Sequence, residues 1–111
     1  MKNHESCVAI WKAIEKIPRG RVTTYGQIAR EAGFPKHPRL AGYALRNIPD
    51  GMKLPWHRVI NAQGKIAFPL DSEHYALQKS LLEEEGVLFL KGKVDLSRYG
   101  WRSKSDAPIL D

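Results

Sequence analysis

Cysteine is almost absent from this sequence, because Cys7 is the only one among 111 residues. A disulfide within the chain is therefore excluded, and a lone thiol fits a reducing compartment. Its place in an apolar helical stripe predicts that Cys7 is a small core residue. One cysteine and four scattered histidines do not supply a Cys/His zinc site, so we expect no metal and no other cofactor.

Long hydrophobic runs are also missing, since charged residues interrupt every apolar stretch. Neither a signal peptide nor a membrane span is recognisable, which predicts a soluble cytoplasmic protein without a membrane partner. The length favours one domain, for which we expect residues 1–102, followed by a flexible tail at 103–111. We expect the protein to be a monomer.

Charge is unevenly distributed along the chain, which has a formal net charge of +6 and a pI near 9.6. Residues 1–70 contain 12 Lys/Arg and 4 Asp/Glu, whereas residues 71–111 contain 6 and 8. A basic half is what a phosphate-facing surface requires. An ordinary solvated surface explains the same composition, so charge alone leaves both interpretations open.

The first half of the chain shows three segments with helical periodicity, at residues 4–17, 24–32 and 38–48. Thr24 is a suitable N-cap for the second, and a turn containing Gly33 separates it from the third. Two short helices joined in this way have the dimensions of a helix-turn-helix. The predicted core residues of the first two helices are Cys7, Ile10, Trp11, Ile14, Ile17, Ile28 and Ala29.

The third helix combines small residues with arginines. Ala41, Gly42 and Ala44 allow another surface to approach closely, and Arg39 and Arg46 carry positive charge. Tight packing of this helix in the core explains the small residues equally well.

The second half predicts a small β element and one more long helix. Residues 57–60 read as extended and 61–64 as a turn. Ser72 is expected to cap a helix that runs to Glu85 and ends at Gly86. A hairpin follows at 87–90 and 93–96, and then a last turn at 97–101. The predicted core residues of the long helix are Tyr75, Leu77, Leu81 and Leu82.

The most specific string is Leu54-Pro55-Trp56-His57-Arg58-Val59-Ile60. It resembles the active-site motif Pro-Cys-His-Arg-Val of O6-alkylguanine-DNA alkyltransferases, with tryptophan in place of cysteine. The segments 20–29, 38–46 and 82–87 are similar to other parts of that family, in the same order. Tryptophan at the cysteine position is the pattern of the alkyltransferase-like proteins. The resemblance implies a mainly α fold with a small β element, a winged helix-turn-helix DNA-binding domain.

Alkyl transfer requires a nucleophile, and the resemblance places Trp56 where that nucleophile would be. An indole N–H donates a hydrogen bond but does not accept an alkyl group. His57 and Glu85 match the pair that activates the family's thiol, so they and Arg58 are expected to support the former active site. We therefore expect no catalytic residue and no enzymatic activity. Trp56 either stacks on a flipped base or is a core residue that fills a pocket without a ligand.

The resemblance assigns DNA contacts to the two helices of the helix-turn-helix. Tyr25 matches a tyrosine that presses the phosphate of the target nucleotide, although it also suits a packed helix cap. Arg39 matches an arginine finger that fills the space left by the extruded base, or else it contacts a phosphate. Docking is expected in the minor groove rather than the major groove. The predicted DNA-binding residues are Arg39, Tyr25, Thr24, Ala41, Gly42 and Arg46.

Residues 61–70 correspond to the loop that closes the family's pocket, and here the sequence departs from the family. Active alkyltransferases usually have a run similar to Asn-Tyr-Ser-Gly-Gly, whereas this chain has Phe68-Pro69-Leu70-Asp71. The contacts of that run cannot be transferred, because Pro69 lacks an N–H. The predicted lesion pocket consists of Trp56, Tyr25, Val59 and Gly64, with the backbone around Val59 facing the guanine edge.

The sequence thus predicts a DNA damage sensor that binds duplex DNA containing O6-alkylguanine and flips the lesion. The resemblance further implies that the bound complex marks the lesion for nucleotide excision repair proteins of the UvrA type. Two alternatives remain. One is an enzyme that uses another nucleophile, and the other is a helix-turn-helix transcription regulator that reads an undamaged operator.

Overall fold

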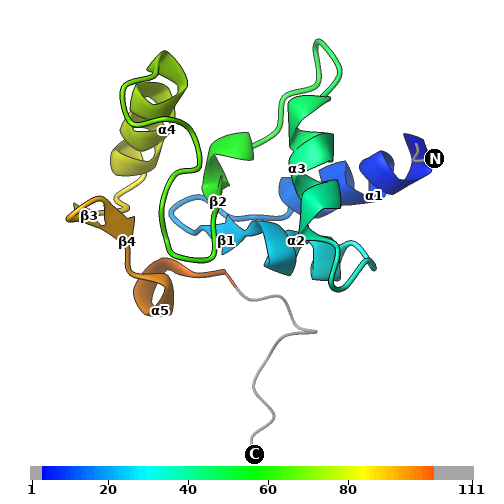
Figure 1. Ribbon diagram of the computed structural model, residues 1–111, viewed down its shortest axis with the longest axis horizontal. Helices are drawn as coiled ribbons and strands as arrows, with labels where there is room; N and C mark the ends of the chain where they lie inside the picture. Colours follow the sequence, from blue (N-terminus) through cyan, green and yellow to red (C-terminus); the bar gives the residue numbers. More distant parts are fainter. Residues whose placement is uncertain (1–3, 102–111) are drawn as a thin grey trace, which may run out of the picture.

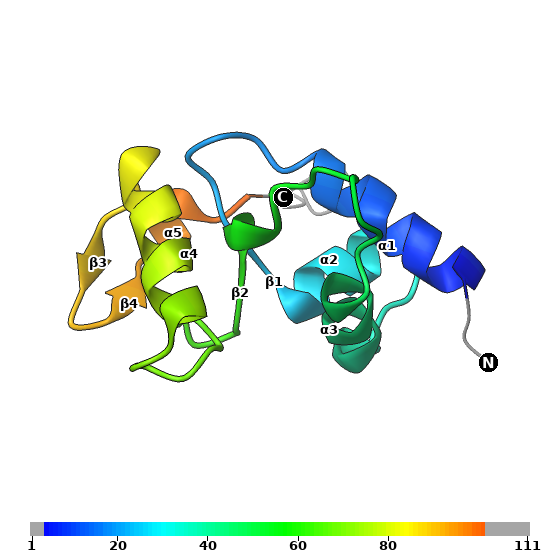
Figure 2. The same ribbon diagram turned by 90° about the horizontal axis from the view of Figure 1, so that it is seen from above.

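The computed structural model describes residues 4–101, and it is mainly helical with a small β element, as predicted. Two groups of elements lie on either side of a short parallel strand pair (Figure 1; Figure 2). The first group contains α1 (His4–Glu15), α2 (Tyr25–Glu31) and α3 (Pro38–Arg46). The second contains α4 (Glu73–Glu84), α5 (Leu96–Tyr99) and the antiparallel strands β3 (Phe89–Leu90) and β4 (Lys93–Val94).

Side-chain caps fix where the helices begin. The Thr24 hydroxyl accepts a hydrogen bond from the Gln27 amide at 3.1 Å, and the Ser72 hydroxyl accepts one from the Tyr75 amide at 3.1 Å. Both caps satisfy a backbone donor that the first turn leaves free, and both confirm the predicted helix starts. Gly86 follows α4 with a φ of +91°, a conformation that glycine adopts without strain.

The first hydrophobic core lies between α1, α2 and α3. The indole Nε1 of Trp11 donates a 2.8 Å hydrogen bond to the carbonyl of Ala44, which joins α1 to α3. Ala41 and Ala44 are fully buried. The prediction that Ala41 contacts DNA is therefore wrong, since its methyl group faces the core and permits the close approach of the helices. The predicted stripe of α1 and the inward residues of α2 are confirmed as buried.

The parallel pair joins β1 (Thr23–Thr24) to β2 (Val59–Ile60), with Thr23 opposite Val59 and Thr24 opposite Ile60. Side chains alternate along a strand, so Val59 enters the first core and Ile60 enters a second core. The second core packs α4 against the hairpin and α5 through Val22, Ile60, Ile66, Leu82, Val87, Val94 and Tyr99. β2 thus holds the preceding segment at the junction of the two cores.

Two predicted elements differ from the structure in form. Only 59–60 of the predicted extended segment is a strand, because Trp56–Arg58 forms one turn of 3-10 helix (η1). The Arg58 amide donates to the Pro55 carbonyl at 3.0 Å, which closes that turn. The third helix ends at Arg46, two residues before the predicted end, and α5 begins one residue before the predicted turn. The predicted tail at 103–111 lies outside the described residues.

The predicted turn at 61–64 is confirmed and is fastened to the hairpin. The Asn61 side chain accepts hydrogen bonds from the amides of Gln63 and Lys65 at 3.0 and 2.9 Å. The Gly64 carbonyl accepts one from the Val94 amide at 2.8 Å. Gly64 has a φ of +82°, and a Cβ there would lie 2.6 Å from the Val94 carbonyl oxygen. Only glycine allows this contact between the turn and β4.

Across residues 4–101, no helix is long and apolar enough to cross a membrane. In the same range, no three histidine, cysteine or carboxylate side chains cluster as metal ligands would.

Candidate nucleic-acid interface

A cavity of about 1070 Å³ opens between α3 and α4, with η1 between them. Its walls come from the first residue of α2, one face of α3, η1 and β2, the segment 67–69, and the first half of α4. None of the residues that line it within the described chain is acidic. The lining consists of Tyr25, Pro38, Arg39, Gly42, Leu45, Arg46, Ile48, Trp56, Val59, Ala67, Phe68, Pro69, His74, Leu77 and Gln78. An apolar, aromatic wall with arginines at one side suits a planar base attached to a phosphate chain.

Trp56 is partly exposed and forms part of the cavity wall, so its ring does not close the cavity. Its amide donates to the Leu54 carbonyl at 2.7 Å, which fixes the start of η1. The indole meets the rings of His57 and Phe68 edge to face, with centroids 6.0 and 6.3 Å apart. Phe68 in turn stacks on His74 of α4 at 5.1 Å. This aromatic series extends the wall from η1 to α4.

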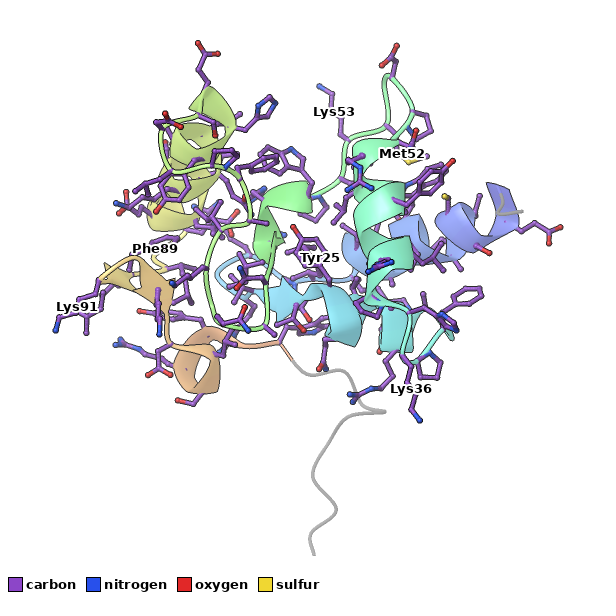
Figure 3. All side chains as sticks on the ribbon, in the orientation of Figure 1. Tyr25, Lys36, Met52, Lys53, Phe89 and Lys91 are labelled. Atoms are coloured by element: carbon purple, nitrogen blue, oxygen red, sulfur yellow. The ribbon has the colours of Figure 1, made fainter. Side chains whose placement is uncertain are left out.

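Tyr25 and two arginines form the side of the cavity nearest the helix-turn-helix. Tyr25 is the first residue of α2, and its side chain lies between α3 and the 56–58 turn (Figure 3). Burial raises the pKa of Tyr25, and the positive charge of Arg46 offsets part of that rise. The phenol therefore stays protonated and able to donate a hydrogen bond at neutral pH. Arg39 and Arg46 are exposed at opposite ends of α3.

Glu85 holds the η1 turn that contains Trp56. Its carboxylate accepts hydrogen bonds from Arg58 Nη2 at 2.7 Å, His57 Nε2 at 2.8 Å and the Gly20 amide at 2.9 Å. Arg58 Nε also donates to the carboxylate, at 3.0 Å to Oε1, and Nη1 donates to the Ile17 carbonyl at 2.7 Å. Glu85 therefore ties η1 to the end of α4 and to the loop after α1. His57, Arg58 and Glu85 do not line the cavity, which fits the supporting role expected of them.

The same hydrogen bonds determine how Glu85 titrates. Burial raises the pKa of this carboxyl, but the hydrogen bonds from Arg58, Gly20 and His57 outweigh burial and lower the pKa from 4.5 to about 2. The charged form is thus favoured in the folded state, and the side chain is only 6% exposed, so solvent screens it little.

We predict a loss of stability in acid that originates at Glu85. A carboxyl whose pKa is lower in the folded state stabilises the fold above its unfolded pKa and loses that contribution as pH falls toward the folded value. The contribution is about 3 kcal/mol, lost between about pH 5 and pH 2. Urea unfolding at several pH values measures it. The Glu85→Gln variant should show a correspondingly smaller dependence on pH, and an unchanged dependence would contradict the assignment.

Two more of the predicted contact residues lie away from this cavity. Gly64 is buried in the turn against β4, so the prediction that it belongs to the pocket is wrong. Thr24 caps α2 and lines a separate small depression beside α5. Tyr25, Val59, Trp56, Arg39, Gly42 and Arg46 all line the cavity.

The sequence prediction missed two residues of α4. Leu77, predicted to face the core, is 48% exposed and lines the cavity, whereas Gln78 occupies the core position and is 2% exposed. Tyr75, Gln78 and Leu82 follow the helical spacing of a buried face, so a polar residue at this spacing was a usable signal. The core residues of this helix were predicted from apolar character alone, which selected Leu77 and passed over Gln78.

Comparison with known proteins gives consistent matches across most of the chain. Residues 6–87 match the family described as 6-O-methylguanine DNA methyltransferase, DNA binding domain. A DNA base-flipping protein of Vibrio parahaemolyticus is 48% identical over 86% of this chain and 94% of its own length. A DNA base-flipping protein of Escherichia coli is 42% identical over 83% of this chain and 70% of its own.

A solved structure matches the fold closely. It is S. pombe Atl1 in complex with damaged DNA containing O6-carboxymethylguanine, which superimposes with a TM-score of 0.82 at 37% identity. The match covers 93% of this chain and 100% of the other. The agreement includes both sides of the parallel strand pair, and it confirms the predicted fold class.

Proposed function

This chain belongs to the 6-O-methylguanine DNA methyltransferase DNA-binding domain family, and on that premise we propose that it binds O6-alkylguanine in duplex DNA without removing the alkyl group. The observation that carries the proposal is the open cavity lined by Trp56, the residue that the motif resemblance aligns with the family's cysteine. S. pombe Atl1, which shares this fold, has been solved with DNA that contains an alkylated guanine.

The α2–α3 pair is the surface proposed to dock on the duplex. Arg39, Gly42 and Arg46 line the cavity from α3, so the same face carries positive charge and borders the cavity. Gly42 adds no side chain to this face, which lets the helix backbone come close to a narrow groove. We propose docking in the minor groove, with binding that depends strongly on salt and little on sequence.

The cavity is proposed to receive the flipped base. Its volume of about 1070 Å³ leaves room for a purine with an alkyl substituent. Extruding a base costs a few kcal/mol, and stacking on an aromatic side chain returns about 1–3 kcal/mol. Trp56 provides that stacking surface, and the Tyr25 hydroxyl, which stays protonated, is placed to donate toward the nucleotide.

Retention of the alkyl group follows from the groups available. The indole of Trp56 is no nucleophile, and the His57–Glu85 pair beneath it has no thiol to activate. Cys7 is buried in the core between α1, α2 and α3, outside the cavity lining. We propose that the protein acts as a monomer in the cytoplasm and that its stable complex recruits nucleotide excision repair proteins of the UvrA type.

We predict that the protein binds a duplex with one O6-methylguanine at least about tenfold more tightly than the same duplex with guanine. A damaged base costs less to unpair, and burial of a methyl group adds about 0.8 kcal/mol. Fluorescence anisotropy with labelled duplexes measures both affinities.

Incubation with duplex labelled on the methyl group tests the second part of the proposal. The label should stay on the DNA. Equal affinities for the two duplexes would contradict lesion recognition, and label on the protein would contradict a non-enzymatic role. A strong preference for one undamaged sequence would favour a transcription regulator instead.

A further inference from the structure

Gln78 is a buried polar side chain that belongs to the cavity wall. It lies on the inner face of α4, is 2% exposed and lines the cavity opposite α3. Its Nε2 donates to the carbonyl of His57 at 2.9 Å and to that of Val59 at 3.0 Å. The side chain therefore binds the backbone carbonyls of the two residues that flank Arg58, in the segment directly after Trp56.

These two hydrogen bonds determine which way the amide points. The NH₂ group has two hydrogens, and two carbonyl oxygens occupy them. The reversed amide would place its oxygen against both carbonyls, so the observed orientation is the one the site enforces. The carbonyl oxygen Oε1 is then the one polar atom of Gln78 that is still available for a hydrogen bond, and no described residue donates to it. The buried side-chain oxygens without a partner among residues 4–101 are Thr23 Oγ1 and Tyr99 Oη, so Gln78 Oε1 is not closed off and a ligand in the cavity can donate to it.

The other polar side chains of the wall differ from Gln78 in what they can do. The guanidinium groups of Arg39 and Arg46 and the indole of Trp56 only donate, and no carboxylate lines the cavity. The Tyr25 hydroxyl and the His74 imidazole can accept, but each also carries a donor. Gln78 Oε1 is thus a side-chain oxygen that accepts without donating.

An O6-alkylguanine has a single hydrogen-bond donor in its base. Alkylation at O6 removes the N1 hydrogen, so N1 becomes an acceptor and only the exocyclic 2-amino group still donates. We infer that Gln78 Oε1 accepts a hydrogen bond from the 2-amino group of the flipped lesion. Gln78 is then the residue that selects guanine-derived bases, and this inference rests on the proposed function.

A purely structural role for Gln78 makes a different prediction. If the side chain only clamps the 57–59 backbone, its loss loosens η1 and weakens every flipped base to the same extent. If Oε1 also reads the base, the loss depends on whether the 2-amino group is present. The two roles therefore separate when protein and base are altered together.

The experiment uses O6-methylguanine, O6-methylhypoxanthine, which lacks the 2-amino group, and guanine, each in the same duplex. The unaltered protein should bind O6-methylguanine roughly tenfold more tightly than O6-methylhypoxanthine. Gln78→Met, which keeps the length of the side chain without its polar atoms, should lose most of that difference. Gln78→Lys keeps donors for the two carbonyls but has no acceptor, and should lose it as well. Ser80→Ala, at an exposed position of α4 outside the cavity lining, should retain it.

The outcomes separate the inference from the function beneath it. If the unaltered protein does not distinguish the two methylated bases, or if both Gln78 variants keep the full difference, Gln78 does not read the 2-amino group. Lesion binding itself stands in either case. If the unaltered protein binds O6-methylguanine no better than guanine, the proposed function fails and the inference fails with it. Circular dichroism shows whether each variant is folded.

Discussion

Replacing Glu85 with glutamine should lower the free energy of unfolding by about 3–5 kcal/mol, a large part of the stability of a domain this size. The carboxylate accepts hydrogen bonds from Arg58, His57 and Gly20, and its side chain is 6% exposed. An amide presents NH₂ hydrogens to at least one of these donors. It also leaves the Arg58 guanidinium, whose side chain is 16% exposed, without its counter-charge. Urea unfolding measures the loss.

Glu84→Gln is the matched control, because it makes the same change one residue earlier on an exposed side chain. The contact that involves Glu84 uses its backbone carbonyl, which accepts from Arg19, and the substitution leaves that group in place. The control should change stability by less than about 0.5 kcal/mol. Similar losses in the two variants would show that the Glu85 network contributes little to the fold.

The large effect expected at Glu85 gives the His57–Glu85 pair a structural role. The two side chains that donate to Glu85, those of His57 and Arg58, belong to η1. Glu85 itself follows α4, and Gly20 precedes β1. The network therefore joins the two groups of elements at the point where η1 crosses between them. In this protein the pair therefore holds η1, and with it Trp56, in place against the end of α4.

Elements whose residues signal locally were predictable from the sequence. Thr24 and Ser72 predict helix starts because each hydroxyl accepts a hydrogen bond from an amide three residues later. Gly86 predicts a helix end because glycine adopts the positive φ that this position has. Such contacts span a few residues and need no knowledge of the rest of the fold. Helix periodicity likewise predicted the buried stripe of α1, since every residue on it faces one core.

Features that depend on distant segments were not predictable in the same way. Ala41 and Gly42 are adjacent small residues, and only the positions of α1 and α2 decide that Ala41 is buried while Gly42 lines the cavity. Gly64 is required by a carbonyl of β4, thirty positions further along the chain. Gln78 is buried because two carbonyls from η1 and β2 satisfy its amide. Hydrophobicity cannot signal a polar residue whose partners come from another element.

Replacing Arg39 with alanine should weaken binding to an O6-methylguanine duplex by about 3 kcal/mol, roughly 100-fold, and leave stability unchanged. Arg39 is exposed in the first turn of α3 and lines the cavity. On the proposed function, a flipped base leaves an unstacked gap in the duplex, and a planar guanidinium beside the cavity is placed to fill it. Without it, the cost of extrusion is not compensated. Anisotropy measures the affinity, and urea unfolding measures the stability.

Two variants separate gap filling from simple attraction to phosphate. Arg39→Lys keeps the charge but not the plane, so it should recover only a minor part of the lost affinity. Arg98→Ala removes the same charge from α5, outside the cavity lining, and should cost no more than about threefold. A lysine variant that binds the lesion as tightly as the unaltered protein would identify Arg39 as a phosphate contact. Equal losses on damaged and undamaged duplex in Arg39→Ala would do the same, because the gap exists only where a base has left the stack.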